Sequence, residues 1–532
     1  MTIATIRMWS WMRPALAESV VRGFQGLLFA STVAAAAAAA GPDDVAPTPS
    51  GTAVRLIGGE EVEFGPESAP VAGVKLNRPL GKSDFTIGLS FQTEASGVRD
   101  LGDLVSLWDA RRRMGFTLGL RDNTGVTTSQ ANRRQLQFGI DAGTTPSWRA
   151  EGRPGEALLG FSIAVHEGRL YVGTCEPELP HRGQVYRYDG PGRWEPLGAP
   201  DGSNSVTAMA VHEGRLYVAT GKYLTAGSAL PASDNLERGG RVFRFVGPGV
   251  WEPAGDLDPT PAVAALVSFG GRLYASSLYR PAGFFRYEGG ERWTSIPTPG
   301  GRRVQSLAVF DGALYASSYD GATVSRFDGE SWTDLKPVAD DVTQTYSFAV
   351  YNGSLHVGAW PTGKVYRLEG DGSWADAGRL GAETEVMGML VHNGSLYAGS
   401  LPRAEVYRYE GDASWSLLKQ LDATPDVTYR RAWTMATYQG RLFVTTLPSG
   451  EVWSMSAGRL VTHDHELSPG WHDVVAQRAS GALRLFLDGR LVSQADDADL
   501  DLATEGQELT IGNGPRGRFV GSMKNAWIET AP

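Results

Sequence analysis

The chain has 532 residues, 42% of them apolar, with a formal net charge of −10 and a single cysteine, Cys175. This length exceeds what one hydrophobic core usually serves, so two domains are expected. The acidic balance, without a run of Lys or Arg, excludes nucleic acid and anionic membrane surfaces as expected partners. One cysteine cannot form an internal disulfide, and we expect Cys175 to be neither a redox site nor a nucleophile.

The first forty residues have the pattern of a secretory signal. Arg7, Arg13 and Arg22 precede an apolar stretch at residues 24–40 that ends in an alanine run. A basic start, an apolar middle and small residues at the exit predict a signal peptide at residues 1–40, hence a secreted, periplasmic or cell-surface protein. An uncleaved membrane anchor is the alternative, since about 17 residues is the lower limit for spanning a bilayer. A Pro/Thr/Ser linker follows at residues 41–51.

The segments that flank the central part of the chain, residues 52–143 and 457–532, are expected to form strands. In the first segment these lie at residues 53–57, 62–64, 74–77, 85–92, 104–109, 114–121 and 135–140. In the second they lie at residues 459–465, 472–478, 483–487, 490–494, 509–511 and 519–528. Six or seven strands leave open edges, so we predict that the two segments together form one two-sheet sandwich.

Residues 144–456 repeat one unit. It reads Ala-Val-x-x-Gly-Arg-Leu-Tyr-Val-Gly-Thr, then Val-Tyr-Arg-Tyr-x-Gly, then Trp, and its turn glycine recurs every 41 to 57 residues. This period is typical of propellers and solenoids. Four short alternating runs per unit predict an all-β, seven-bladed propeller of four-stranded blades, inserted into the sandwich between residues 140 and 459. The turn glycines are Gly168, Gly214, Gly271, Gly312, Gly353, Gly394 and Gly440.

The tryptophans of the repeat predict how the ring closes. A Trp precedes every turn glycine by 19 to 25 residues, and the first of them, Trp148, lies before the first inner strand. The seventh unit has a third strand at residues 451–455 but no Trp of its own afterwards. We therefore predict that residues 147–149 form the outer strand of the seventh blade, which joins the two ends of the array by backbone hydrogen bonds.

Both parts resemble known families. Pro-Gly-Trp-His-Asp-Val-Val at 469–475, Leu-Arg-Leu-Phe-Leu-Asp-Gly at 483–489 and Leu-Thr-Ile-Gly at 509–512 resemble the laminin-G-like, concanavalin-A-like jelly roll, as do residues 85–140 and 519–528. The repeats resemble Kelch or galactose-oxidase-like propellers, without a recognisable copper-radical set. The jelly-roll resemblance implies a fold but no ligand, because the fold serves binders and enzymes alike. Lys524 replaces a common acidic residue, and the family's calcium site is not carried over.

Two positions of the repeat, which we call slots, are expected to lie near the centre of the ring. Six residues before each turn glycine the side chain is small, as the crowding of inner strands at the axis requires. One residue earlier the side chains are dissimilar, which predicts the rim of the channel. The small slot holds Ser162, Ala208, Ala265, Ser306, Ser347, Gly388 and Thr434, and the dissimilar slot holds Phe161, Thr207, Ala264, Gln305, Tyr346, Met387 and Trp433.

The candidate binding residues belong to one face of the predicted propeller. Loops between second and third strands share a face with loops that lead into the first strand, and here both are rich in aromatic and charged residues. Aromatic rings stack on sugars, while Arg and Asp bond hydroxyls or carboxylates, so a glycan is the expected ligand. The longest loop, residues 221–240, is a candidate lid. The candidate ligand-binding residues are Tyr223, Tyr279, Arg280, Tyr319, Asp320, Tyr346, Trp360, Arg403, Arg430, Arg431 and Trp433.

No catalytic, metal or cofactor site is assigned from the sequence. His463 and His465 have a spacing that can hold a metal but lack an evident third ligand, and residues 496–501 could hold calcium but are expected to be a solvated loop. Asp320, Asp341 and Glu385 are candidates, by location alone, for the two carboxylates that a glycosidase needs.

The sequence thus favours an exported glycan-binding or adhesion protein, not an enzyme, whose partners are a glycan or an extracellular protein. The alternatives are a polysaccharide-degrading hydrolase or lyase with its site on the propeller loop face, and a protein-binding scaffold.

Overall fold

The computed structural model describes residues 44–65, 70–76, 78–93, 102–176 and 182–531, which are all-β with short 3₁₀ turns such as η2 (Thr225–Ser228) and η3 (Pro299–Gly301). The expected signal peptide or anchor at residues 1–40 lies outside the described residues. Within them, no helix is long and apolar enough to cross a membrane.

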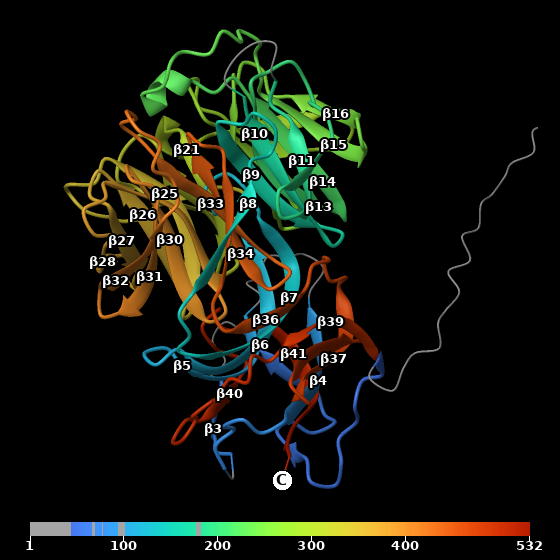
Figure 1. The fold of residues 1–532 in the computed structure, drawn as a ribbon. Helices are drawn as coiled ribbons and strands as arrows, with labels where there is room; N and C mark the ends of the chain where they lie inside the picture. The colour runs from blue at the N-terminus through green and yellow to red at the C-terminus, as the bar shows by residue number, and fades with distance from the viewer. Residues whose placement is uncertain (1–43, 66–69, 77, 94–101, 177–181, 532) are drawn as a thin grey trace, which may run out of the picture. The chain divides into compact units, whose positions relative to one another are not determined.

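Strands from the two flanking segments form two antiparallel sheets (Figure 1). The first sheet contains, in spatial order, β1 (Val54–Arg55), β41 (Gly521–Thr530), β4 (Phe85–Thr93), β37 (Gly470–Ala479), β38 (Ala482–Leu487) and β39 (Arg490–Asp496), with β2 (Val62–Phe64) beside β41. The second contains β3 (Val71–Val74), β40 (Leu509–Ile511), β5 (Asp103–Asp109), β6 (Met114–Asn123), β7 (Asn132–Ala142) and β36 (Arg459–His463).

One hydrophobic core joins these two sheets. Phe85 of β4 packs against Phe116 of β6 and Phe138 of β7, with ring centroids 5.4 and 6.2 Å apart. Each sheet combines strands from before and after the repeats, since β4 pairs with β37 and β41, and β7 with β36. The strand expected at residues 74–77 lies instead at β3, because Val71 and Val74 pair with β40, a partner that the local pattern does not reveal.

The strands between β7 and β36 form one eight-stranded and five four-stranded antiparallel sheets. The eight-stranded sheet consists of β9 (Leu159–His166), β10 (Arg169–Cys175), β11 (Val185–Gly190) and β12 (Arg193–Pro196), followed by β13 (Ser205–His212), β14 (Arg215–Gly221), β15 (Arg241–Gly247) and β16 (Val250–Asp256). A single pair, Cys175 opposite Ser205, joins its two halves.

The other five sheets follow in chain order. They are β17 (Val263–Phe269), β18 (Arg272–Ser277), β19 (Phe284–Tyr287) and β20 (Trp293–Ile296); β21 (Val304–Phe310), β22 (Ala313–Ser318), β23 (Ser325–Phe327) and β24 (Trp332–Asp334); β25 (Gln344–Tyr351), β26 (Ser354–Trp360), β27 (Lys364–Leu368) and β28 (Trp374–Arg379); β29 (Glu385–His392), β30 (Ser395–Leu401), β31 (Glu405–Gly411) and β32 (Ser414–Gln420); and β33 (Arg431–Tyr438), β34 (Arg441–Leu447) and β35 (Val452–Ser456) with β8 (Ser147–Gly152).

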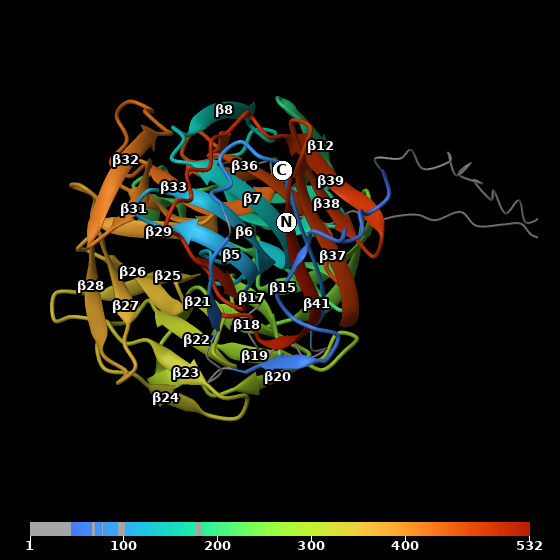
Figure 2. The same cartoon turned by 90° about the horizontal axis from the view of Figure 1, so that it is seen from below.

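The inner strands of these sheets form a closed ring. Strands β9, β13, β17, β21, β25, β29 and β33 lie against one another in that order, and β33 returns to β9 (Figure 2). Strand β8 pairs with β35, with Trp148 opposite Met455. The predicted pairing of residues 147–149 with the third strand of the last unit is therefore confirmed.

The repeated Trp ties each outer strand to the sheet that precedes it. Its indole N–H donates a hydrogen bond of 2.7–3.1 Å to a backbone carbonyl of that sheet or of the loop after it. The bonds run from Trp194 to Glu151, Trp251 to Leu197, Trp293 to Ala254, Trp332 to Pro297, Trp374 to Lys336 and Trp415 to Ala377. Four of these carbonyls belong to buried residues and need a donor, which explains why the Trp recurs.

The loop between β6 and β7, residues 124–131, fills the centre of the ring; we call it the plug loop. All eight of its residues are buried. It makes hydrogen bonds to six of the seven inner strands. Bonds of 2.9–3.4 Å join Val309 N to Thr124 Oγ1, Phe348 N to Gly125 O, Thr434 Oγ1 to Val126 O, Leu266 N to Thr128 O, Ile163 N to Ser129 Oγ, and Gln130 N to Met209 O.

The plug loop accounts for the small side chains predicted at the axis. The hydroxyl of Ser306 donates to the carbonyl of Thr127. On β29, a Cβ atom added at Gly388 would lie 2.8 Å from the carbonyl oxygen of Trp433, closer than real Cβ contacts allow. Small residues are needed here because a loop of the sandwich, as well as the seven strands, occupies the centre.

We expect Asn132→Ala to lower the free energy of unfolding by about 2–3 kcal/mol, because it leaves buried polar groups unpaired. Asn132 is 1% exposed, donates to Thr437 O at 2.8 Å and accepts from Thr437 N at 3.1 Å and from the Asn123 amide at 2.6 Å. Urea denaturation followed by tryptophan fluorescence measures the change. The half-buried Asn513→Ala is the control, and an equal loss in both variants would contradict the importance of the contact between β7 and β33 next to the plug loop.

Candidate functional site

The loops that were predicted to share one face meet in one apolar cluster at the end of the ring. Its members come from the ends of inner strands and the loops beside them. Five of the candidate residues belong to this cluster, namely Tyr223, Tyr279, Tyr319, Tyr346 and Trp433. The structure therefore brings together side chains that lie up to 210 residues apart in the sequence.

The dissimilar slot forms the floor of this face. All seven of its residues, which were expected at the rim of the channel, are buried. The reason is that loop side chains cover them. Trp433 donates to the carbonyl of Phe161 at 2.7 Å and packs edge-on against its ring, and Tyr223 covers Phe161 with a centroid distance of 5.0 Å.

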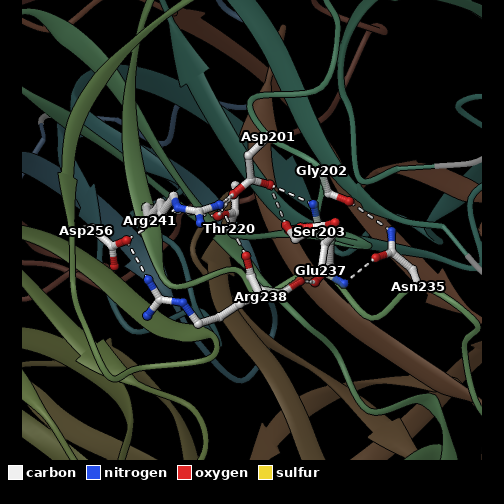
Figure 3. A network of polar contacts seen from close by, with 11 residues as sticks. Asp201, Gly202, Ser203, Thr220, Asn235, Glu237, Arg238, Arg241 and Asp256 are labelled. Carbon is white, nitrogen blue, oxygen red and sulfur yellow. Dashed lines mark hydrogen bonds and ion pairs between the residues drawn. The ribbon is translucent and has the colours of Figure 1, made fainter. Parts of the chain in front are cut away.

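Residues 221–240, which we call the lid loop, are held firmly at both ends. At the first end, Tyr223 N donates to Asn204 Oδ1 at 2.7 Å, and the Asn204 amide donates back to Tyr223 O. At the other end, Asn235 donates to Gly202 O at 2.9 Å, and Arg238 forms an ion pair with Asp256 (Figure 3). These bonds fix where the lid loop leaves and rejoins the ring.

The centre of the lid loop is held by fewer contacts, all through side-chain atoms of the cluster. Ser228, at the end of η2, accepts a hydrogen bond from Arg431 Nη1 at 2.7 Å and shares one with the hydroxyl of Tyr223. Leu224 N donates to the hydroxyl of Tyr279 at 3.1 Å. The lid loop therefore rests on tyrosine hydroxyls and one guanidinium, groups that a ligand could also engage.

A buried carboxyl and a buried guanidinium lie beneath the lid loop. Glu385 is 4% exposed and Arg431 is 8% exposed. Burial raises the pKa of Glu385 to about 7, against the opposing influence of Arg431 and of a hydrogen bond from Tyr346. Tyr346 in turn hydrogen-bonds to Tyr319, which is half-buried, so a polar chain leads from the surface to Glu385. Glu385 is thus largely protonated at pH 6 and about half protonated at pH 7, so it can act as a general acid or a neutral hydrogen-bond donor.

Three charged residues of this face occupy the same slot of three repeats. Arg303, Glu385 and Arg431 lie nine residues before the turn glycines Gly312, Gly394 and Gly440. In the first three repeats this slot holds Leu159, Ser205 and Ala262, none of which is charged. The charge is therefore concentrated on one arc of the ring, and this slot is the signal with which Arg303 and Glu385 could have been grouped with Arg431 from the sequence.

The remaining candidates lie further out, and most are engaged by the protein itself. Asp320 binds Arg303 through Nη2 at 2.6 Å and Arg280 at 3.2 Å, and the Arg303 bonds hold the pKa of Asp320 down at about 2. Arg403 is bound to Glu383 at 2.8 Å. Arg430 donates to Thr424 O at 2.7 Å, while Trp360 is half-buried.

The aromatic ring of Tyr319 is stacked between side chains. Arg303 lies over it at 4.5 Å from the centroid, and Tyr346 packs at 5.8 Å. Asp341 is exposed, so of the three carboxyls named from the sequence only Asp320 and Glu385 connect to this cluster.

The described residues contain no group of three or more His, Cys, Asp or Glu arranged to hold a metal ion. His463 and His465 stack with ring centroids 5.0 Å apart. In the acidic run at residues 496–501, Asp496, Asp497 and Asp499 pair with basic side chains of this chain, Arg459, Arg478 and Lys82. Cys175 is fully buried, and burial raises the pKa of its thiol.

We expect Glu385→Gln to raise the free energy of unfolding at pH 8 by about 2–3 kcal/mol and to change it little at pH 4.5. The folded pKa of about 7 exceeds the ordinary value of 4.5, so the folded state binds the proton more tightly than the unfolded chain. Stability is therefore lost as pH rises between these two values, and glutamine removes that loss. Urea denaturation at both pH values measures it, and an equal effect at both would contradict the raised pKa.

No protein-family model and no curated protein sequence matches the chain. Many solved structures are similar in fold. Virginiamycin B lyase from Staphylococcus aureus is 10% identical with a TM-score of 0.47, over 58% of this chain and 99% of its own. The WD40 β-propeller domain of Doa1 is 12% identical with a TM-score of 0.42, over 58% and 97%. BamB from Moraxella catarrhalis is 9% identical with a TM-score of 0.38, over 76% and 97%. These neighbours are β-propellers, and at these identities and TM-scores they carry no argument about this chain.

Proposed function

We propose that the chain is a seven-bladed propeller inserted into a laminin-G-like, concanavalin-A-like jelly roll. Seven groups of four strands around one ring support the blade number, because each group has one turn glycine between its first and second strands. The two sheets that share a core and combine strands from both ends of the chain support the insertion. The pairing of β8 with β35 supports closure of the ring by its first and last strands.

We propose that this protein is an exported, lectin-like carbohydrate-binding or adhesion protein that uses the propeller loop face. The observation that carries this proposal is the tyrosine cluster around Arg431 and Glu385, with Tyr319 at the surface and Tyr346 below it. Tyrosines present flat apolar rings and hydroxyls together, which suits the alternating faces and hydroxyls of a sugar. Export remains an inference from residues 1–40.

A polysaccharide-degrading enzyme is the second candidate, favoured by one observation. Asp320 and Glu385 have pKa values displaced in opposite directions, to about 2 and about 7, and the Tyr319–Tyr346 pair lies between them. A carboxylate that stays ionised beside a carboxyl that stays protonated is the combination that glycoside hydrolysis uses. An extracellular protein-binding scaffold is the third candidate, and it follows from the folds alone.

Binding of the full chain to a printed glycan array tests the first proposal. We expect at least one glycan to be bound, and we expect Tyr319→Ala and Trp360→Ala to weaken that binding about tenfold, which corresponds to about 1.4 kcal/mol. The loss of a stacking ring accounts for a change of this size. Trp332→Ala is the matched control, since Trp332 lies on the outer strand β24 and donates to Pro297 O.

The array also separates the three candidates. A slide that loses the printed glycan after incubation with the chain would favour the enzyme over the lectin. If Tyr319→Ala and Trp360→Ala still bind the glycan but Trp332→Ala does not, the binding site lies away from the propeller loop face. Failure to bind any glycan would end the carbohydrate proposal and leave the protein-binding scaffold.

A further inference from the structure

Arg431 differs in its partners from three other buried arginines of this protein. Arg133, Arg478 and Arg516 each form an ion pair with a carboxylate, namely with Asp122, Asp497 and Asp103. Arg431 is 8% exposed, close to the 7% of Arg133, but none of the ion pairs within 4.0 Å among the described residues involves its guanidinium. A buried cation is costly when no anion compensates it, and the other three sites follow that rule.

The hydrogen bonds of Arg431 are also incomplete. Its Nη1 donates to the neutral hydroxyl of Ser228 at 2.7 Å, and its Nε is buried with no partner. The acid whose charge acts on Arg431 is Glu385, and its raised pKa of about 7 keeps it largely neutral at pH 6. On the floor, the buried Gln305 Oε1 likewise lacks a hydrogen-bond donor. The unpaired Nε of Arg431 is a buried donor available to a polar ligand.

We infer that Arg431 binds the carboxylate of an acidic sugar residue, such as a uronic acid, and that this carboxylate displaces Ser228 from the guanidinium. The inference rests on the proposed carbohydrate-binding function and names the class of sugar. A guanidinium presents parallel N–H donors that match the two oxygens of a carboxylate, which a serine hydroxyl cannot do. Tyr223, Tyr319 and Tyr346 lie close enough to Arg431 to act on its charge, and they belong to the same apolar cluster as Tyr279 and Trp433. These rings supply the stacking surface for the sugar.

The lid loop gives a route to the guanidinium. Its ends are fixed by Asn204 and Asn235, whereas η2 between them is held to the ring side chains by the Ser228 and Leu224 bonds. Displacement of Ser228 therefore costs hydrogen bonds to Arg431 and Tyr223 but leaves both anchors in place. The bidentate bond to a charged carboxylate is stronger than the bond to a hydroxyl that it replaces.

The groups that face Arg431 also set a pH dependence. The groups with the largest influence on the charge of Arg431 are Glu385 and the hydroxyls of Tyr223, Tyr319 and Tyr346. Burial raises the pKa of Tyr223 and Tyr346, so these hydroxyls stay protonated in the range that matters. Only Glu385 changes charge near pH 7, and its ionised form competes with and repels the carboxylate of a ligand.

Calorimetric titration of the full chain with trigalacturonate and with its methyl ester tests the inference. The two probes differ only in the carboxylate. We expect the acid to bind at least tenfold more tightly than the ester, and we expect Arg431→Gln to abolish that preference while binding of the ester persists. The matched control is Arg408→Gln, because Arg408 is equally buried, at 8%, but lies on β31 and is paired with Glu410.

Two further variants do not depend on the fold tolerating a change at Arg431. Ser228→Ala removes the competing hydroxyl, and we expect it to tighten binding of the acid several-fold without affecting the ester. We expect the wild-type chain to bind trigalacturonate less tightly at pH 8 than at pH 6, because Glu385 ionises between these values. We expect Glu385→Gln to remove this difference.

The outcomes separate this inference from the proposed function. Equal affinity for the acid and the ester, or a preference that Arg431→Gln leaves intact, overturns the carboxylate role of Arg431 while glycan binding stands. A preference for a sulfated trisaccharide over trigalacturonate would overturn the choice of carboxylate. If neither probe nor any glycan of the array binds, the proposed function fails and this inference fails with it.

Discussion

The insertion of the plug loop into the ring is the constraint on which the other features of this structure depend. Inner strands of a closed ring present backbone and side-chain groups toward the axis, and those groups need partners once water is excluded. Here the loop between β6 and β7 provides them, with Gln130 donating to Met209 O and Ala131 accepting from Val165 N. Buried hydrogen bonds thus join the two sheets built from the flanking segments to the ring. Each of these bonds has one partner in the plug loop and one in an inner strand.

The plug loop also decides what kind of site the opposite face can be. Because it closes the axis, the floor residues Phe161 and Trp433 are sealed from below and covered from above by loop side chains. The loop face therefore has a floor of buried side chains beneath the lid loop. This geometry explains how Glu385 and Arg431 become buried although they begin strands β29 and β33 at the ends nearest the loops.

The electrostatics of that face follow from burial combined with an uneven use of one repeat slot. Arg303 and Arg431 carry positive charge at the slot where the first repeats carry Leu159 and Ala262. Arg303 is neutralised by Asp320, whose pKa falls to about 2, whereas Arg431 faces a carboxyl whose pKa rises to about 7. Two arginines at equivalent positions thus have different environments, and only the second has a donor left without a partner.

Local sequence patterns predict much of the fold. The turn glycines, the alternation of each run and the position of Trp148 predict four-stranded units and the pairing of β8 with β35, because strand pairing through tight turns depends on neighbouring residues. The candidate face was also predictable, since loops at equivalent points of a repeat emerge on the same side, and Tyr223, Tyr279 and Tyr319 do meet there.

The tertiary structure alone decided the rest. Nothing in residues 124–131 marks them as the filling of a ring formed later in the chain, because their partners, from Ile163 to Thr434, are set by how the sandwich is docked. The burial of Tyr346 and Trp433 and the raised pKa of Glu385 likewise depend on which side chains cover them. The sequence determined which residues form the strands and turns of this protein. Burial arises only when distant segments pack, and it decided the pKa of Glu385 and which donor of Arg431 has no partner.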